Sequence, residues 1–529
     1  MRKTLSLKNQ RIELPADYNR LIQTITLCAP TQKIELDIDV TNKASLPAIL
    51  ESALLLVAQI EAVSSTELAN FFGLNEHERD VLVSEMIESD LVKYNNEGDL
   101  ISTAKLVAQR RDGAVDNGLS IEEVKNFRTF TYIDQCTGHI QPRSEEEPQK
   151  GLPLMERSYN SKDYSQLLAN QFDRFKACLP DRHELKTPKA HLYRVNSANV
   201  VNSGLPQQVS LSIHAAHDPL NGIRLDTRLM DYKDEHCALV QKSGLIGKAI
   251  DWLTEQRGEC PSSTLEDYCE LANDEVIKRY VKKDLASGCQ YLDLLNLLHD
   301  RLKHRTFYSN QDVQMMIGPM YAPTSGNRDK VLQWAKRQSK NKHMHQGVWL
   351  GADNELFGAS LGLQSFFKDM NNELQKGDRN SSLNLVFQAD REGQNYHATL
   401  QKGNTFGTRT DGNLMSFLDG KTDTHVEMMV FPGENGCALI QYHAYLDPRL
   451  GLGRLTLPIG YFTTDPDRVS FIWKILRSRI QSKVTKFNSD NEVKSINEQL
   501  DCEPSKLDGM LVNRTELRLQ ALAERFNKK

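Results

Sequence analysis

Four side chains in the C-terminal third of the sequence could carry acid–base or nucleophilic chemistry: His345, His425, Glu427 and His443. An imidazole can attack phosphorus or transfer a proton near neutral pH, and a carboxylate can accept that proton. Glu427 and His443 flank a predicted pair of strands. With Asp447 they could therefore converge at one end of a sheet as an acid and a base. The alternative is that each histidine only completes a hydrogen bond in the core.

The spacing of the first two histidines resembles that of phospholipase D-like nucleases. His345 begins the sequence His-Gln-Gly, residues 358–360 read Gly-Ala-Ser, and His425 begins His-Val-Glu ahead of an apolar strand. The resemblance implies that one histidine attacks phosphorus, that the other protonates the leaving group, and that a lysine two residues after each holds the phosphate. Gly347 and Glu427 occupy those two lysine positions, and the carboxylate of Glu427 would repel phosphate.

Two stretches of the same region are basic in a chain whose formal net charge is −5. Together they could form a surface that binds the phosphates of DNA without reading its sequence. The alternative is that each stretch is the solvated face of a helix. The candidate nucleic-acid contacts are Arg328, Lys330, Lys336, Arg337, Lys340, Lys342, Arg468, Lys474, Arg477, Arg479, Lys483 and Lys486.

No metal site and no cofactor site is predicted. His214 and His217 precede Asp218, but the spacing places no third ligand beside them. Residues 244–249 read Gly-Leu-Ile-Gly-Lys-Ala, which lacks the first glycine of a phosphate-binding loop and the Ser or Thr after the lysine.

The elements that must position these residues alternate between strands and helices. Short apolar runs predict strands, and amphipathic stretches predict helices between them. The alternation predicts an α/β domain over residues 311–487. Its strands are expected at 313–317, 348–350, 383–387, 426–431 and 438–445, and its helices at 327–341, 359–376 and 466–486.

The whole chain is predicted to be a mixed α/β multidomain protein. Before the α/β domain we expect N-terminal strands at 1–40, a helix-turn-helix domain at 41–112, a linker at 113–150 and a mostly helical region at 151–310. That region should hold one strand at 209–213 and longer helices at 238–256 and 262–285. After the α/β domain, the tail 488–529 should hold one amphipathic helix.

Residues 46–104 have the pattern of three helices followed by a hairpin. An apolar run begins at Ala53, and Ser64 with Glu67 fits a capping box. Asn75 is suited to cap the third helix, and the turn Asn-Asn-Glu-Gly ending at Gly98 predicts a two-stranded wing. This order resembles the winged helix-turn-helix family, and the resemblance implies that the third helix enters the DNA major groove.

The charges of that third helix argue against groove reading. Residues 76–90 hold six acidic side chains and one arginine, Arg79. Because contacts to phosphates supply most of the affinity for DNA, an acidic helix would be repelled. The basic residues come later instead, at Lys105, Arg110 and Arg111. The sequence therefore favours contacts with other protein subunits, or a domain with a solvated acidic face.

Composition places the chain among globular proteins. It has 529 residues, of which 39% are hydrophobic and 26% charged. No signal peptide or membrane span is expected. The nine cysteines are dispersed, which predicts reduced thiols and a cytoplasmic protein.

These observations together predict a non-enzymatic accessory protein. It would associate with DNA without sequence specificity or form complexes with other subunits, and would not contact membranes. A winged helix joined to a large unrecognised domain is common in bacterial anti-phage and mobile-element systems. By that analogy, the protein is expected to belong to such a system. The alternatives are a hydrolase acting on nucleic acid and a protein-interaction scaffold without DNA contact.

Overall fold

The computed structural model has a mixed α/β fold, as predicted. Within the residues that it describes, no helix is both long and apolar enough to cross a membrane. It describes residues 13–113, 120–142, 151–160, 163–180, 183, 185–186, 190–230, 234–255, 260–261, 263–304, 307–322, 326–341, 345–379, 381–389, 415–419, 425–433, 435–480 and 484–485. The predicted tail helix lies outside these residues.

Two nearly continuous antiparallel runs of chain form a long β arm. One run is β1 (Asn19–Ala29) followed by β2 (Thr31–Ser45), and the other is β7 (Ala190–Ser203) followed by β8 (Gln207–Asp218). Strand β5 (Ser120–Asp134) pairs with the full length of β2. The 15 residues of β2 alone extend about 50 Å at roughly 3.3 Å per residue. The arm is completed by β6 (Ile140–Gln141) beside β5 and by β9 (Gly222–Leu229) beside β8.

Apolar side chains alternate along β2, and they lie on the face of the arm that helices cover. Ile34, Leu36, Ile38 and Val40 are buried against Phe175 and its neighbours. The covering helices are α5 (Tyr164–Asn170) and α6 (Phe172–Cys178).

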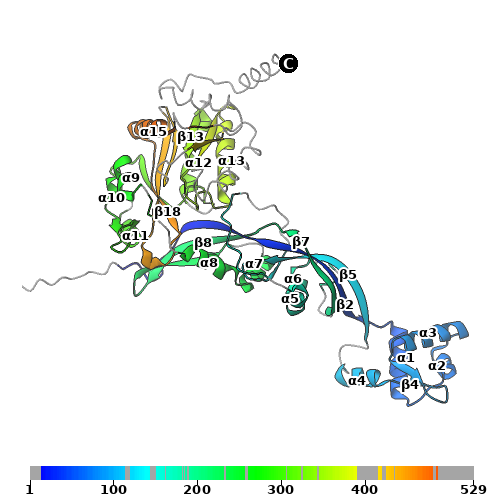
Figure 1. The fold of residues 1–529 in the computed structure, drawn as a ribbon. Helices are drawn as coiled ribbons and strands as arrows, with labels where there is room; N and C mark the ends of the chain where they lie inside the picture. Colours follow the sequence, from blue (N-terminus) through cyan, green and yellow to red (C-terminus); the bar gives the residue numbers. More distant parts are fainter. Residues whose placement is uncertain are drawn as a thin grey trace, which may run out of the picture.

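The predicted three helices and hairpin lie between β2 and β5, at the far end of the arm (Figure 1). We call residues 46–113 the insert. Its buried core draws only on its own side chains, such as Leu50, Leu82 and Met86. Its elements are α1 (Ala48–Gln59), α2 (Ser65–Phe72), α3 (Glu76–Glu88), β3 (Val92–Tyr94), β4 (Leu100–Ser102) and α4 (Ala104–Gly113).

The C-terminal region forms an eight-stranded sheet in the order β12-β18-β17-β16-β13-β14-β15-β19. Its strands are β12 (Val313–Ile317), β13 (Gln346–Leu350), β14 (Ser382–Ala389), β15 (Met415–Asp419), β16 (Val426–Phe431), β17 (Cys437–Tyr445), β18 (Thr456–Thr463) and β19 (Val484–Thr485). All the strands predicted here are present, but β15, β18 and β19 were missed, although all eight residues of β18 are buried. The helix predicted at 466–486 ends at Ile480, and β19 lies within its predicted range.

Helices cover both faces of this sheet. Trp349 and Met429 point to the face covered by α12 (Gly326–Asn341) and α13 (Gly362–Gln375). Val348 and Met428, one residue earlier on the same strands, point to the face covered by α15 (Pro466–Ile480). Figure 1 shows α15 and α12 on opposite sides of the sheet.

Two predictions for the middle of the chain are wrong. The predicted linker 113–150 contains β5, and the region predicted to be mostly helical contains the long strands β7 to β9. Only the part of β8 at 209–213 was predicted as a strand. The strands β5 and β7 were missed because most of their described residues are exposed or half-exposed and their partner β2 is distant in the sequence.

The two long helices predicted within that region are also divided. The first breaks at Gly244, with φ +73°, into α7 (Asp234–Lys242) and α8 (Leu245–Thr254). The second ends as α9 (Leu265–Leu271), because Asn273 adopts a left-handed conformation with φ 50° and Asp274 caps α10 (Glu275–Lys278). The hairpin of β10 (Val281–Lys283) and β11 (Gln290–Leu292) and then α11 (Leu294–Lys303) follow.

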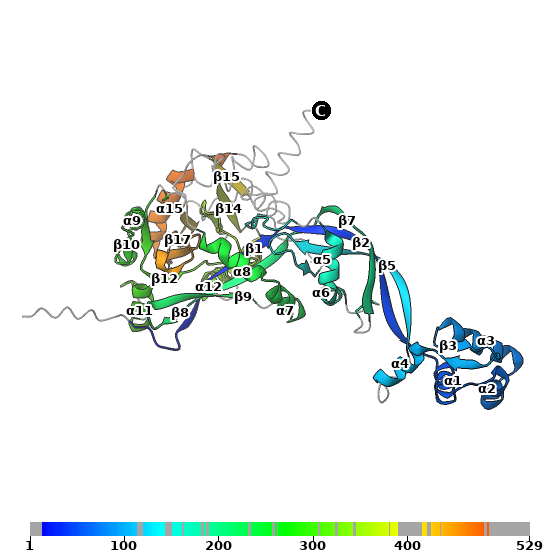
Figure 2. The ribbon, with the colours of Figure 1, turned by 60° about the horizontal axis from the view of Figure 1, so that its bottom comes forward.

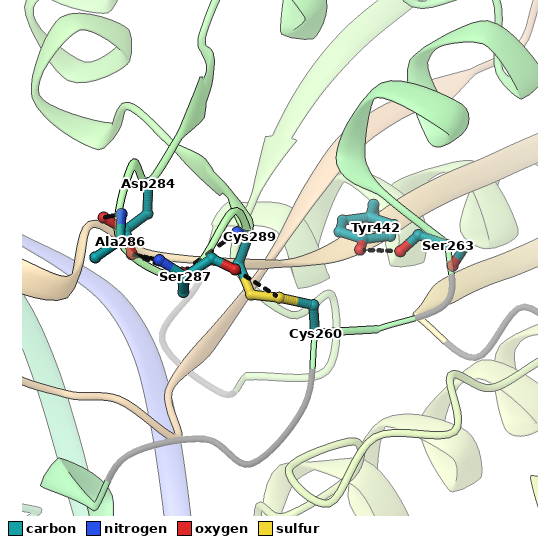
Figure 3. The surroundings of a disulfide bond; sticks show 7 residues. All are labelled: Cys260, Ser263, Asp284, Ala286, Ser287, Cys289 and Tyr442. Atoms are coloured by element: carbon teal, nitrogen blue, oxygen red, sulfur yellow. Dashed lines mark hydrogen bonds between the residues drawn. A yellow bond between two sulfur atoms is a disulfide. The ribbon is translucent and has the colours of Figure 1, made fainter.

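One pair of cysteines departs from the prediction of reduced thiols. Cys260 and Cys289 form a disulfide with their Cα atoms 5.6 Å apart (Figure 3). The bond joins the segment before α9 to the turn of the β10–β11 hairpin. The two cysteines are 29 residues apart in the sequence, and the β10–β11 hairpin places Cys289 beside Cys260.

Candidate functional site

The structure brings together Glu427 and His443 in a closed network. His443 Nε2 donates to Glu427 Oε2 at 2.9 Å, and Trp349 Nε1 donates to Glu427 Oε1 at 2.9 Å. Glu427 is 0% exposed and His443 is 1% exposed. The three side chains come from neighbouring strands β16, β17 and β13, which pair edge to edge.

His425 joins this network through the backbone. Its Nδ1 lies 2.9 Å from the carbonyl oxygen of His443, to which it donates. Burial and the charge of Glu427 raise the pKa of Tyr321, which packs beside Trp349. A buried carboxylate is costly unless it is paired, and here Glu427 is paired with side chains from the two neighbouring strands. Its burial leaves no surface of Glu427 for a substrate in this structure.

His345 lies apart from His425. Val348 on β13 is opposite Val430 on β16, and the two strands are antiparallel. His345 precedes β13 while His425 precedes β16, so the two lie at opposite ends, about 25 Å apart at roughly 3.3 Å per residue. The paired histidines that the phospholipase D resemblance implies are therefore not formed.

Asp447 does not reach the Glu427 network. It forms an ion pair with Arg449 at 2.5 Å and lines a cavity of about 520 Å³ beside the β8–β9 turn. His217 and Asp218 also line this cavity, whereas His214 Nδ1 contacts Asn19 at 2.9 Å. Among the residues that the structure describes, no three His, Cys, Asp or Glu side chains are grouped so that they could hold a metal ion.

The first basic stretch lies on α12, where only part of it is exposed. Arg328 pairs with Asp369 of α13 at 2.5 Å. Lys336, Arg337 and Lys340 are exposed, and none of them has an ion pair within the described part of the chain. Lys330 is half-buried, and burial lowers the pKa of its ammonium group. Lys342 lies outside the described residues.

The second basic stretch lies on α15, behind the sheet. Arg468 stacks over the ring of Tyr461 at 5.0 Å, Lys474 is exposed, and Arg477 and Arg479 are half-buried. Because α12 and α15 cover opposite faces of the sheet, the two stretches do not form one surface. Lys483 and Lys486 lie outside the described residues.

The insert presents an acidic helix to solvent. Positions three and four apart on α3 share one exposed side, which we call the α3 face. Arg79 of α3 is already paired with Asp80 at 2.7 Å, so it adds no free positive charge. The residues of the α3 face are His77, Asp80, Val81, Ser84, Glu85 and Glu88.

Apolar side chains accompany this acidic surface. Val81, in the middle of the α3 face, is 45% exposed, and Phe71 at the end of α2 is 69% exposed. Phe71 packs edge-on against Phe72 at 5.1 Å between ring centres. Exposed aromatic and aliphatic groups beside charges are common in protein interfaces.

Two further residues were missed by the sequence analysis. Arg20 of β1 and Arg301 of α11 are half-buried cations, and burial lowers the pKa of Arg301 to about 10. No local sequence signal could have found them, because Arg20 lies about 280 positions before Arg301 in the chain.

Comparisons with known proteins assign no family. No family model matches the chain, and no curated protein matches it. Among solved structures, the chain is similar at 8% identity to TrmBL2, described as an archaeal chromatin protein with a novel mode of DNA binding. The match covers 83% of this chain and 94% of that one with a TM-score of 0.20, which does not establish a common fold.

Proposed function

We propose that this protein is a non-enzymatic, complex-forming protein whose insert binds a basic surface on a protein partner. The observation that carries the proposal is the acidic α3 face, which no other described element covers. The remote position of the insert supports it too. The arm holds the insert away from the helices that cover the C-terminal sheet, in a place that a partner can approach (Figure 2).

Charge favours a protein partner over DNA for this face. Glu85 and Glu88 project from the side of α3 that would enter the major groove, where phosphates would repel them. A basic protein groove would instead gain from both carboxylates, and Val81 on the same face would add apolar contact.

A fluorescent deca-arginine peptide tests the proposal as a model of a basic partner. We expect the double variant Glu85→Gln/Glu88→Gln to bind it at least about threefold more weakly than the wild type at low salt, since each exposed ion pair contributes about 0.2–1 kcal/mol. The measurement is fluorescence anisotropy during titration with protein.

The matched control is Glu270→Gln/Glu275→Gln, which removes two exposed carboxylates from α9 and α10. This control should bind the peptide as the wild type does. If both pairs of substitutions weaken peptide binding equally, the affinity depends only on the net charge of the protein. That result would contradict the proposal.

A second candidate function is nucleic-acid contact through α12. Lys336, Arg337 and Lys340 are exposed on neighbouring turns and are without carboxylate partners in the described chain. Three phosphate contacts predict that the logarithm of the binding constant falls by about 2.7 per tenfold rise in salt. Titration of duplex DNA at several salt concentrations measures this slope, and no detectable binding at low salt would exclude the candidate.

A further inference from the structure

The C-terminal end of α12 presents a basic surface whose charge is opposite to that of the α3 face. A β-carbon at Gly377 would lie 2.8 Å from Cα of Ser339, so the chain that leaves α13 runs against this end of α12. Arg379 follows two residues later and adds an exposed cation to those of the helix. None of these cations forms an ion pair with another residue that the structure describes. The residues of this surface, which we call the α12 face, are Lys336, Arg337, Lys340 and Arg379.

Local stability does not account for the carboxylates of the α3 face. Glu85 and Glu88 lie in the last turn of α3, where the negative end of the helix dipole disfavours a carboxylate and favours a cation. That turn holds no basic residue of its own. A cation supplied from outside the insert would therefore be attracted by both carboxylates and by the dipole.

The spacing of charges on the two faces also matches. Glu85 and Glu88 are three positions apart, and so are Arg337 and Lys340. Each pair therefore spans about 4.5 Å along its helix, and side chains three positions apart share one side of the helix. Two helices laid side by side can thus form two ion pairs at once, whether they run parallel or antiparallel.

The arm separates the α3 face from the α12 face of the same chain. β1 is anchored to the C-terminal region, because Thr26 N donates to the carbonyl oxygen of Ala359 at 2.8 Å. From there β2 extends about 50 Å to the insert at roughly 3.3 Å per residue. Figures 1 and 2 both show the insert and α12 at opposite ends of the arm. A second copy of the chain must therefore supply one of the two faces.

We propose that the α3 face of one copy binds the α12 face of a second copy of this chain. The inference rests on the proposed function, because it names the basic partner of the α3 face. Each copy carries both faces, so a two-fold dimer makes the contact twice. Exposed ion pairs are individually weak and are screened by salt, so the dimer should form at low ionic strength and high protein concentration.

Sedimentation velocity of the full chain tests the inference with two variants in which one face is reversed in charge. The α3 variant is Glu85→Arg/Glu88→Arg, and the α12 variant is Lys336→Glu/Arg337→Glu/Lys340→Glu. The wild type should dimerise at low salt and dissociate as salt is added. Each variant alone should dimerise at least about tenfold more weakly, because like charges then face each other across the contact.

An equimolar mixture of the two variants is the decisive sample. The acidic α3 face of the α12 variant meets the unchanged α12 face of the α3 variant, and the two reversed faces also have opposite charges. The mixture should therefore dimerise although neither variant does so alone. Rescue by mixing also shows that both variants are folded, since a misfolded chain would not regain a partner.

Two control variants reverse exposed charges elsewhere. Glu270→Arg/Glu275→Arg changes α9 and α10, and Lys282→Glu/Lys283→Glu changes β10. Both controls should dimerise as the wild type does. If they weaken the dimer as much as the face variants do, the association follows net charge alone and the inference is wrong.

Three further results would overturn the inference. One is a wild type that stays monomeric at low salt. If deca-arginine still binds that monomer through the α3 face, the proposed function stands and the partner is a different protein; if it does not, both fail. The second is a dimer that neither face variant weakens. The third is a monomeric chain whose α12 variant loses affinity for duplex DNA, which would assign the α12 face to nucleic acid.

Discussion

Glu427 is fully buried, so its carboxylate is stabilised by its two hydrogen-bonded partners and not by water. His443 and Trp349 each donate to one of its oxygens at 2.9 Å. The sequence singled out Glu427 and His443 as a pair that could meet at a sheet end. It could not reveal that they would be buried, because burial depends on Trp349 and Phe357 packing over them from other segments.

The first prediction concerns this buried pair. His443→Leu alone should lower the free energy of unfolding by about 3–5 kcal/mol, because it leaves the Glu427 carboxylate buried without its main partner. Glu427→Met/His443→Leu should cost markedly less than the single change, because no charge remains to be buried. Urea unfolding measures both, and a single substitution costing less than about 1 kcal/mol would contradict the structural role.

The second prediction concerns Asp274, whose carboxylate caps α10 and accepts from Tyr308 at 3.0 Å. Burial raises its pKa above the ordinary value of 3.8. The folded state therefore binds this proton more tightly than the unfolded state. The stability contributed by protonation of Asp274 is fully present below the pKa of this group in the unfolded state. It is lost as the pH rises through the pKa of the group in the folded state.

The test compares the wild type with Asp274→Asn, which keeps an acceptor oxygen for the cap. As the pH falls from neutral toward about 4, the wild type should gain stability relative to the variant. Urea unfolding at several pH values measures the difference. If the difference in unfolding free energy between the two proteins stays constant with pH, or changes in the opposite direction, the Asp274 carboxylate does not cause the pH dependence of stability.

At the scale of elements, local signals predicted the insert well. Ser64 and Asn75 form capping boxes with Glu67 and Glu78, so the starts of α2 and α3 were readable from adjacent residues. In the arm, β1 and the first part of β2 lie where N-terminal strands were predicted, but their pairing was not readable. β2 pairs with β5 and with β7, which lie about 90 and 160 residues later, and no local signal indicates such distant partners.

The third prediction tests the capping of α3. Asn75 Oδ1 accepts from the Glu78 amide at 2.9 Å. Asn75→Ala should cost about 1 kcal/mol of insert stability, because the amide loses its acceptor. Amide hydrogen exchange of residues in α3 measures the local loss. Asn96→Ala, an exposed turn residue, is the control. Equal exchange rates in the two variants would contradict the capping role.

At the scale of the whole molecule, the insert is an addition to an otherwise complete fold. Among the residues that the structure describes, none from outside 46–113 belongs to its core. Ser45 of β2 and Ser120 of β5 are directly paired, so the two strands could be joined by a short turn. The insert is therefore placed by the arm and is not part of what holds the arm and the C-terminal sheet together.

The fourth prediction follows from that independence. Replacing residues 46–119 with Asn-Gly, a dipeptide suited to a two-residue hairpin, should leave the free energy of unfolding of the remaining chain unchanged within about 1 kcal/mol. Thermal and urea unfolding followed by the fluorescence of the four tryptophans, all outside the replaced segment, measure it. A large loss of stability would mean that the insert supports the arm.

The same shortened chain gives the most direct test of the central claim, that the insert is the binding element. The measurement is the affinity of fluorescent deca-arginine for the full chain and for the chain without residues 46–119. Our account predicts that the full chain binds the peptide and that removal of the insert weakens binding at least about tenfold, because the α3 face supplies the contacts. Equal affinity of the two chains would contradict it.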